Sequence, residues 1–376
     1  MPRSSRALGP ALALIALGLA AIATTGVDAQ PATRTRAAWK TPRTPDGRPD
    51  LQGNWTNETQ TPLERLNGGG LTLTEAQAAA IEDRAKLVED YRAKASDPNR
   101  AAPAAGGEAN NLAAPGAQSF VEQISEAAGG AVGGYNGFWL DPGLKVIRVD
   151  GVPRSSILID PPDGRIPPLT EAGKERRAQL AARAKQFGEF DHPEVRPLAD
   201  RCVLSFGSNA GPPMLPNYFY NNNYTIVQTP DQVLILTEMV HDVRTVRLNT
   251  KAHAPASMRP WLGDSIGWWE GDTLVIETTN LNPAQVDQTS ILWPYRGASA
   301  NLKVTERLTR TGPDTILYRF TMEDPTVFTA PFTGELPFTR IDEPIYEYAC
   351  HEGNYAMSNI LSGARAEERE ATKKPQ

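Results

Sequence analysis

Hydrophobic and polar positions alternate with a period of two through most of the chain after Cys202. Runs rich in Val, Ile, Thr, Tyr and Phe, each as long as a strand, are separated by turns containing Pro, Gly, Asn and Asp. We predict strands at 224–228, 233–240, 243–248, 265–269, 273–279, 302–309, 315–322, 333–338 and 345–349. Short turns at 230–231, 270–272 and 312–314 favour antiparallel pairing of neighbouring runs.

This pattern predicts a mainly β fold, an antiparallel meander that forms a barrel or strongly curved sheet of the lipocalin or calycin type. Two peripheral helices are expected, at 74–94 with a capping box of Thr74 and Gln77, and at 170–187 with Thr170 as N-cap. A hairpin is expected from runs 144–149 and 156–160.

Composition changes along the chain and divides it into four parts. Residues 1–29 are a predicted signal peptide, and 30–134 an extended arm, a helix and a flexible loop rich in Ala, Pro and Gly at 99–116. Residues 135–363 form the antiparallel β domain with one covering helix, and 364–376 a charged, disordered tail.

The N-terminus has the features of an export signal. Arg3 and Arg6 precede the apolar stretch 7–23, and small residues precede a cleavage point at Gln30. A membrane anchor is the alternative, but the stretch is shorter than the roughly 20 residues that span a bilayer, and Pro10 interrupts it. We expect a periplasmic or secreted protein with no transmembrane segment after cleavage.

Charge and cysteine content narrow the picture further. The formal net charge of −6 argues against a nucleic-acid partner. Two cysteines in an oxidising compartment predict a disulfide between Cys202 and Cys350, with two buried free thiols as the alternative. The four histidines lack the spacing of a zinc motif, so no metal and no cofactor is expected.

Strand parity places several charges among apolar positions. Glu306 shares a face with Val304 and Leu308, and Glu238, Asp242 and Arg244 share one with Leu234 and Leu236 if that run is continuous. We interpret these four charges as an interior ion network that orients a ligand or acts as an acid–base cluster. The alternative is a bulge near His241 that turns the charges outward.

Other candidate site residues are a histidine and several aromatic side chains. His241, next to Asp242, is a candidate general base, and a surface histidine is the equal alternative. The aromatic residues are candidates to wall a ligand pocket, with ordinary core packing as the alternative. They are Tyr220, Tyr224, Trp268, Trp269 and Trp293.

Four sequence blocks resemble a family of exported bacterial proteins of unknown function, found in acidobacteria and proteobacteria. They are RTPDGRPDLQGNW at 43–55, DPPDGRIP at 160–167, GWWEGDTLV at 267–275 and YACHEGNY at 348–355. The resemblance brings no established catalytic residue. The chain departs from the family at Lys303, where the family has His, and at 330–332, where Ala-Pro-Phe replaces Arg-Pro-Trp.

Three functions remain open on this evidence. The first is binding of a small apolar or aromatic molecule in the barrel. The second is a small-molecule hydrolase, lyase or isomerase that uses His241 with Asp242 or Glu306 as acid and base and Arg244 to orient an anion. The third is a non-catalytic structural protein of the cell envelope, indicated by the Pro-rich arm.

Overall fold

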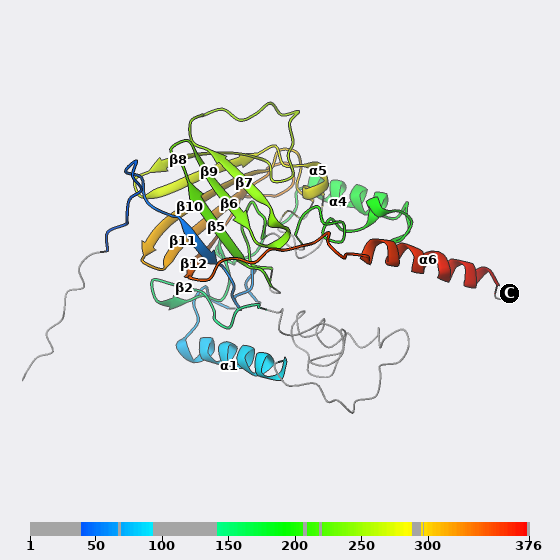
Figure 1. Cartoon of the computed structure of the whole chain (residues 1–376), viewed down its shortest axis with the longest axis horizontal. Helices are drawn as coiled ribbons and strands as arrows, with labels where there is room; N and C mark the ends of the chain where they lie inside the picture. The colour runs from blue at the N-terminus through cyan, green and yellow to red at the C-terminus, as the bar shows by residue number, and fades with distance from the viewer. Residues whose placement is uncertain are drawn as a thin grey trace, which may run out of the picture. The chain divides into compact units, whose positions relative to one another are not determined.

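Nine strands close into a β-barrel in the computed structural model of the chain, which describes residues 39–66, 69–92, 141–205, 209–217, 220–287, 295 and 297–373. Around the barrel the order is β1-β5-β6-β7-β8-β9-β10-β11-β12, and β12 pairs again with β1 (Figure 1). The bounds are Gly53–Thr56 (β1), Asn223–Gln228 (β5), Gln232–Thr237 (β6), Val243–Arg247 (β7), Asp264–Glu270 (β8), Thr273–Thr279 (β9), Lys303–Gly312 (β10), Thr315–Glu323 (β11) and Phe332–Ile341 (β12). The predicted mainly β barrel is confirmed.

The period-two pattern sorts side chains between the barrel interior and its outer face. In β10, Val304, Glu306 and Leu308 are fully buried, whereas the residues between them are partly exposed. Glu306 lies directly opposite Ile276 of β9 and Phe320 of β11, so these three side chains share the interior. The predicted parity of this strand is confirmed.

One pair of strands departs from the predicted meander. β7 and β8 are parallel, with Val246 opposite Ser265, whereas the other neighbouring strands of the barrel are antiparallel. A parallel pair needs a connection that returns along the strands, and residues 248–263 provide it. The all-antiparallel prediction is therefore wrong at this one junction.

The remaining elements lie outside the ring of nine strands. They are β2 (Arg148–Val149), β3 (Val152–Pro153), β4 (Leu158–Asp160), the helices α1 (Glu75–Arg92), α4 (Glu171–Ala184), α5 (Pro283–Val286) and α6 (Ala356–Lys373), and the short 3-10 helices η2 (Pro193–Val195) and η3 (Met239–His241). The two predicted helices are confirmed. Gln77 N donates to Thr74 Oγ1 at 3.2 Å and Gly173 N to Thr170 Oγ1 at 2.9 Å, so the predicted N-terminal residues cap both helices.

The N-terminal arm is part of the barrel and not only a cover for it. β1 pairs with β5 on one side and β12 on the other, and Leu51 and Trp55 are fully buried. Only four residues of this strand are extended. The flexible loop predicted at 99–116 and the signal peptide lie outside the described residues.

Three other local predictions are wrong. β2 pairs with β3, while β4 joins β12, so the predicted hairpin does not form. Residues 345–349 are not a strand, because the closed barrel leaves that segment no free edge to pair with. The segment from residue 364, expected to be disordered, continues α6 to Lys373; its charges include the Arg365–Glu368 pair one turn apart.

The predicted disulfide is present. Cys202 and Cys350 are bonded, and their Cα atoms lie 5.7 Å apart. This bond ties the segment after β12 to the turns that precede β5. None of the helices in the described ranges combines the length and apolar character needed to cross a membrane.

The packing of the barrel interior requires a glycine at position 334, opposite the ring of Phe320 on the neighbouring strand. Gly334 lies opposite Phe320, and a Cβ atom at Gly334 would overlap the Phe320 ring. We predict that Gly334→Ala lowers the free energy of unfolding by about 1–3 kcal/mol, because an overpacked core must shift. Urea denaturation measures it. Gly312→Ala, whose Cβ would meet Thr315 at 3.9 Å, is the matched control and should change little.

Candidate functional site

An ion pair lies inside the barrel, between β7 and β10. Arg244 is 3% exposed and Glu306 is 0% exposed. Arg244 Nη2 donates to Glu306 Oε1 at 2.9 Å, and Nη1 donates to Oε2, so the guanidinium binds the carboxylate with two hydrogen bonds. The Tyr318 hydroxyl on β11 donates to Glu306 Oε1 at 2.6 Å. Sequence parity predicted Arg244 and Glu306 inside the barrel, and the structure brings them together.

The protonation states of this cluster follow from its burial. Burial acts to lower the pKa of Arg244, but the charge and hydrogen bonds of Glu306 outweigh it, so this pKa is raised. Burial and the Glu306 charge both raise the pKa of Tyr318 well above its ordinary value. Arg244 therefore keeps its charge, and the Tyr318 phenol keeps its proton.

The segment Asn209–Asn217 packs onto these interior groups. Its residues are all buried. Met214 N donates to the Tyr318 hydroxyl at 2.9 Å, and Asn57 Nδ2 donates to Met214 O at 3.2 Å. The Tyr295 hydroxyl donates to Pro212 O at 2.6 Å. Side chains of the barrel and its connections thus bind a stretch of main chain in the way they would bind a small polar molecule.

Among the described residues, Nε of Arg244, Oδ1 of Asn57 and Oε1 of Gln285 in α5 are buried and have no hydrogen-bond partner. The residues that carry them are 3%, 1% and 1% exposed. The amide nitrogens of Asn57 and Gln285 donate to main-chain oxygens of the 209–217 segment. Buried polar atoms normally have partners, so these three atoms are groups that a bound molecule could satisfy.

Aromatic rings surround the polar cluster. The ring centroids of Tyr224 and Phe338 lie 5.2 Å apart, and those of Tyr318 and Phe338 lie 5.1 Å apart. Burial raises the pKa of Tyr224, so its hydroxyl also remains protonated, and Asn57 Nδ2 donates to it at 3.2 Å. Of the aromatic residues predicted to line a pocket, Tyr224 faces this interior.

The other predicted aromatic residues are dispersed. Trp269 packs against the core from β8, whereas Trp268 on the same strand is 39% exposed on the outer face and donates to Glu270 Oε1. Tyr220 is partly buried next to the interior segment, where its backbone N donates to Asn217 Oδ1 at 3.1 Å. Trp293 lies outside the described residues.

A second group of predicted residues lies at the turn between β6 and β7. Val240 and His241 both have left-handed backbone angles, with φ of 61° and 47°. This irregular turn shifts the alternation of the chain: Val233 and Ile235 face the interior in β6, whereas Arg244 and Val246 do so in β7. The predicted face of β6, with Leu234 and Leu236 inside, is wrong for that reason.

The carboxyl groups of this turn are in different environments. Glu238 is 2% exposed and accepts hydrogen bonds from Asn223 Nδ2 at 2.6 Å and Tyr346 N at 2.8 Å. His241 is exposed, and its Nδ1 lies 3.0 Å from Tyr348 O. Burial raises the pKa of Asp242 to about 7, although His241 acts to lower it, and Asp242 Oδ2 has no partner.

The contacts therefore divide the five predicted catalytic residues into two groups. Arg244 and Glu306 form an ion pair inside the barrel, so the charge of Arg244 already has a counter-charge. Glu238, His241 and Asp242 occupy the turn, where two of them bind the segment after β12.

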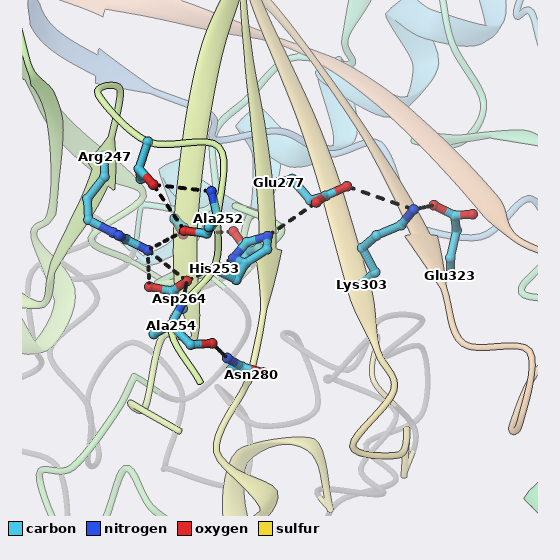
Figure 2. A network of polar contacts seen from close by, with 12 residues as sticks. Arg247, Ala252, His253, Ala254, Asp264, Glu277, Asn280, Lys303 and Glu323 are labelled. Carbon is cyan, nitrogen blue, oxygen red and sulfur yellow. Dashed lines mark hydrogen bonds and ion pairs between the residues drawn. The ribbon is translucent and has the colours of Figure 1, made fainter. Parts of the chain in front are cut away.

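Sequence reasoning missed a polar network on the outer face, which Figure 2 shows. His253 lies between two carboxylates, with Nδ1 2.8 Å from Asp264 Oδ2 and Nε2 3.2 Å from Glu277 Oε1. Asp264 also accepts from Arg247 at 2.8 Å, and Lys303 lies 2.9 Å from Glu323. Outward parity of the strands could have found the acids, but not His253, because it lies in a connection.

This outer network fastens the 248–263 connection to the sheet. Burial acts to raise the pKa of Asp264, but the hydrogen bonds from Ala254 N, His253 and Arg247 outweigh it, and this pKa is lowered. Asn280 Nδ2 adds a hydrogen bond to Ala254 O at 2.9 Å. Within the described part of the chain, no three His, Cys, Asp or Glu side chains are placed to hold a metal ion.

We predict that Glu306→Gln lowers the free energy of unfolding by about 3–5 kcal/mol, because it leaves the Arg244 charge buried without a counter-charge. Urea denaturation at neutral pH measures the change. Glu270→Gln is the matched control, since it removes the exposed pair with Arg307 and should change stability little. Equal effects of the two substitutions would contradict a dry interior around the pair.

Asp242 should make the protein less stable as pH rises. Its pKa is about 7 in the folded chain and 3.8 unfolded, so between these values only the unfolded state has released the proton. We predict that the free energy of unfolding of Asp242→Asn, relative to that of wild type, rises by about 2–4 kcal/mol between pH 4 and pH 8. Above pH 7 this difference should level off.

Urea denaturation across that pH range measures this gain as the difference between the two curves. The difference is needed because burial and Asp141 also raise the pKa of Glu58, to about 8. Asp231→Asn, in the exposed turn after β5, is the control. A constant difference from pH 4 to pH 8 would contradict the assignment to Asp242.

Comparison with known proteins adds little to this geometry. No family model and no curated protein matches the chain. Among solved structures it is similar to a mutant of the fluorescent protein UnaG, with 14% identity over 32% of this chain and 72% of that one, at a TM-score of 0.19. That score is far below the level of a shared fold, so the barrel assignment depends on the strand pairing described above.

Proposed function

We propose that the protein is an exported binding protein whose barrel takes up a small molecule with a flat apolar body and one polar group. The observation that carries the proposal is that Arg244, Asn57 and Gln285 each have a buried polar atom without a partner among the described residues. The hydrophobic core of the chain, which includes Tyr224, Tyr318 and Phe338, supplies aromatic and aliphatic walls. Sites for small molecules combine such apolar walls with a few converging polar groups.

The ligand would bind where the segment Asn209–Asn217 now packs. Pro212, Pro213 and Pro216 lack backbone N–H groups, so this segment offers few donors to the barrel. A ligand that donates to Asn57 or Gln285 and accepts from Arg244 Nε would satisfy atoms that the segment leaves unpartnered. Its ring would contact Tyr224 and Phe338.

Export is part of the same proposal. The disulfide between Cys202 and Cys350 supports an oxidising compartment, as the N-terminal sequence predicts. The catalytic alternative has less support, because His241 and Asp242 share no hydrogen bond or ion pair with Arg244 or Glu306 among the described contacts.

The binding proposal predicts that Tyr318→Phe weakens ligand affinity about tenfold, because the hydroxyl positions the Glu306 carboxylate and the Arg244 guanidinium. The probes are a series of naphthalene carboxylic acids, carboxamides and alcohols, titrated by calorimetry and by chemical-shift changes in the full mature chain. We expect the carboxamides, which both donate and accept, to bind best.

The matched control is Trp268→Phe, which changes an aromatic residue on the outer face of the barrel. It should leave affinity within about twofold of wild type, because exposed side chains remote from a site contribute little to binding. Absence of binding across the series, or equal losses in both variants, would refute binding in the barrel.

A further inference from the structure

The segment 342–355, here called the C-terminal strap, joins β12 to α6 and has no buried residue. Polar contacts and one disulfide connect it to the rest of the described chain. Asn54 Nδ2 donates to Glu343 O at 3.0 Å, Tyr346 N donates to Glu238 Oε1 at 2.8 Å, and His241 Nδ1 lies 3.0 Å from Tyr348 O. The disulfide from Cys350 to Cys202 is the only covalent bond between the described strap and the turns before β5.

A pocket of about 280 Å³ opens beside this disulfide. It is lined by Pro193, Glu194, Asp200, Arg201, Cys202, His351, Asn354 and Met357. Glu194 pairs with Arg201 at 3.1 Å, and Arg196 pairs with both Asp200 and Glu189 at 2.7 Å, so each carboxylate that lines the pocket has an arginine partner. These arginines reduce the repulsion that an approaching thiolate would meet.

We propose that this pocket is the entry site for a dithiol reductant and that the disulfide is a reversible fastener of the strap. Cys202 lines the pocket and Cys350 does not, so a reductant bound in the pocket would attack Cys202 Sγ. Asn354 Nδ2, 3.4 Å from Cys202 Sγ, lies at the same place and can donate to the sulfur that is attacked.

Reduction of the disulfide takes place in two thiol–disulfide exchange steps. One thiolate of the reductant attacks Cys202 Sγ, the bond to Cys350 breaks, and Cys350 leaves as a thiolate that takes a proton from water. The second thiol of the reductant, as its thiolate, then attacks the reductant sulfur of the mixed disulfide. Cys202 is released as a thiol, and the reductant is oxidised to its own internal disulfide.

Release of the strap would uncover the turn between β6 and β7 without opening the barrel. The barrel strands pair with one another, and the strap takes part in none of those ladders. Glu238 would lose the hydrogen bond from Tyr346 N, and His241 its contact with Tyr348 O. The turn with left-handed Val240 and the buried Asp242 carboxyl would then face solvent.

The test treats the full mature chain with dithiothreitol in native buffer, traps thiols with iodoacetamide and follows hydrogen exchange by mass spectrometry. We expect both cysteines to be alkylated at a rate proportional to reductant concentration. We also expect exchange at Tyr346 to rise about tenfold or more while β10 and β11 keep their protection. Reduction only at the rate of global unfolding, or unchanged protection of Tyr346, would overturn the proposal.

A pair of variants on α6 tests the pocket itself. Met357→Trp fills it and should slow reduction about fivefold or more, whereas Ser358→Trp, which adds the same ring next to it on an exposed position, should stay within about twofold of wild type. Equal rates for both variants and wild type would show that reductant does not enter here.

Discussion

Closure of the barrel by β1 is the constraint on which the other features depend. This short strand bridges β5 and β12, so the ring of strands has no open gap, and side chains inside it are buried. A closed ring also gives the segment after β12 no edge to join. That segment remains a strap of exposed residues, held by a disulfide and a few polar contacts.

Burial in the barrel interior limits the polar groups there to partners within the protein. Arg244 and Glu306 are far from solvent, so they must bind each other, and the Tyr318 hydroxyl completes the carboxylate's environment. The remaining donors and acceptors are used by the backbone of the 209–217 segment, and a few have no partner. The proposed binding function depends on this combination of aromatic side chains and buried polar atoms.

The charged groups on the outer face, unlike those in the interior, are in contact with solvent. There Asp264, Glu277 and Lys303 remain partly solvated and attach the one connection that a parallel strand pair requires. Lys303 is part of this network (Figure 2). Its ammonium group forms ion pairs with the carboxylates of Glu277 and Glu323, which stabilise a cation at this position.

Period-two alternation in the sequence predicted most of the strands and the inward direction of Glu306, and Thr74 and Thr170 predicted the starts of two helices, because these features depend on neighbours in the chain. The count of two cysteines, together with the predicted export signal, predicted the disulfide. Only the tertiary structure decided which residue pairs with Glu306, which face of β6 lies inside the barrel, and how His253 is held between Asp264 and Glu277. These features depend on two irregularities of the backbone, the left-handed turn at Val240 and the parallel pair of β7 and β8.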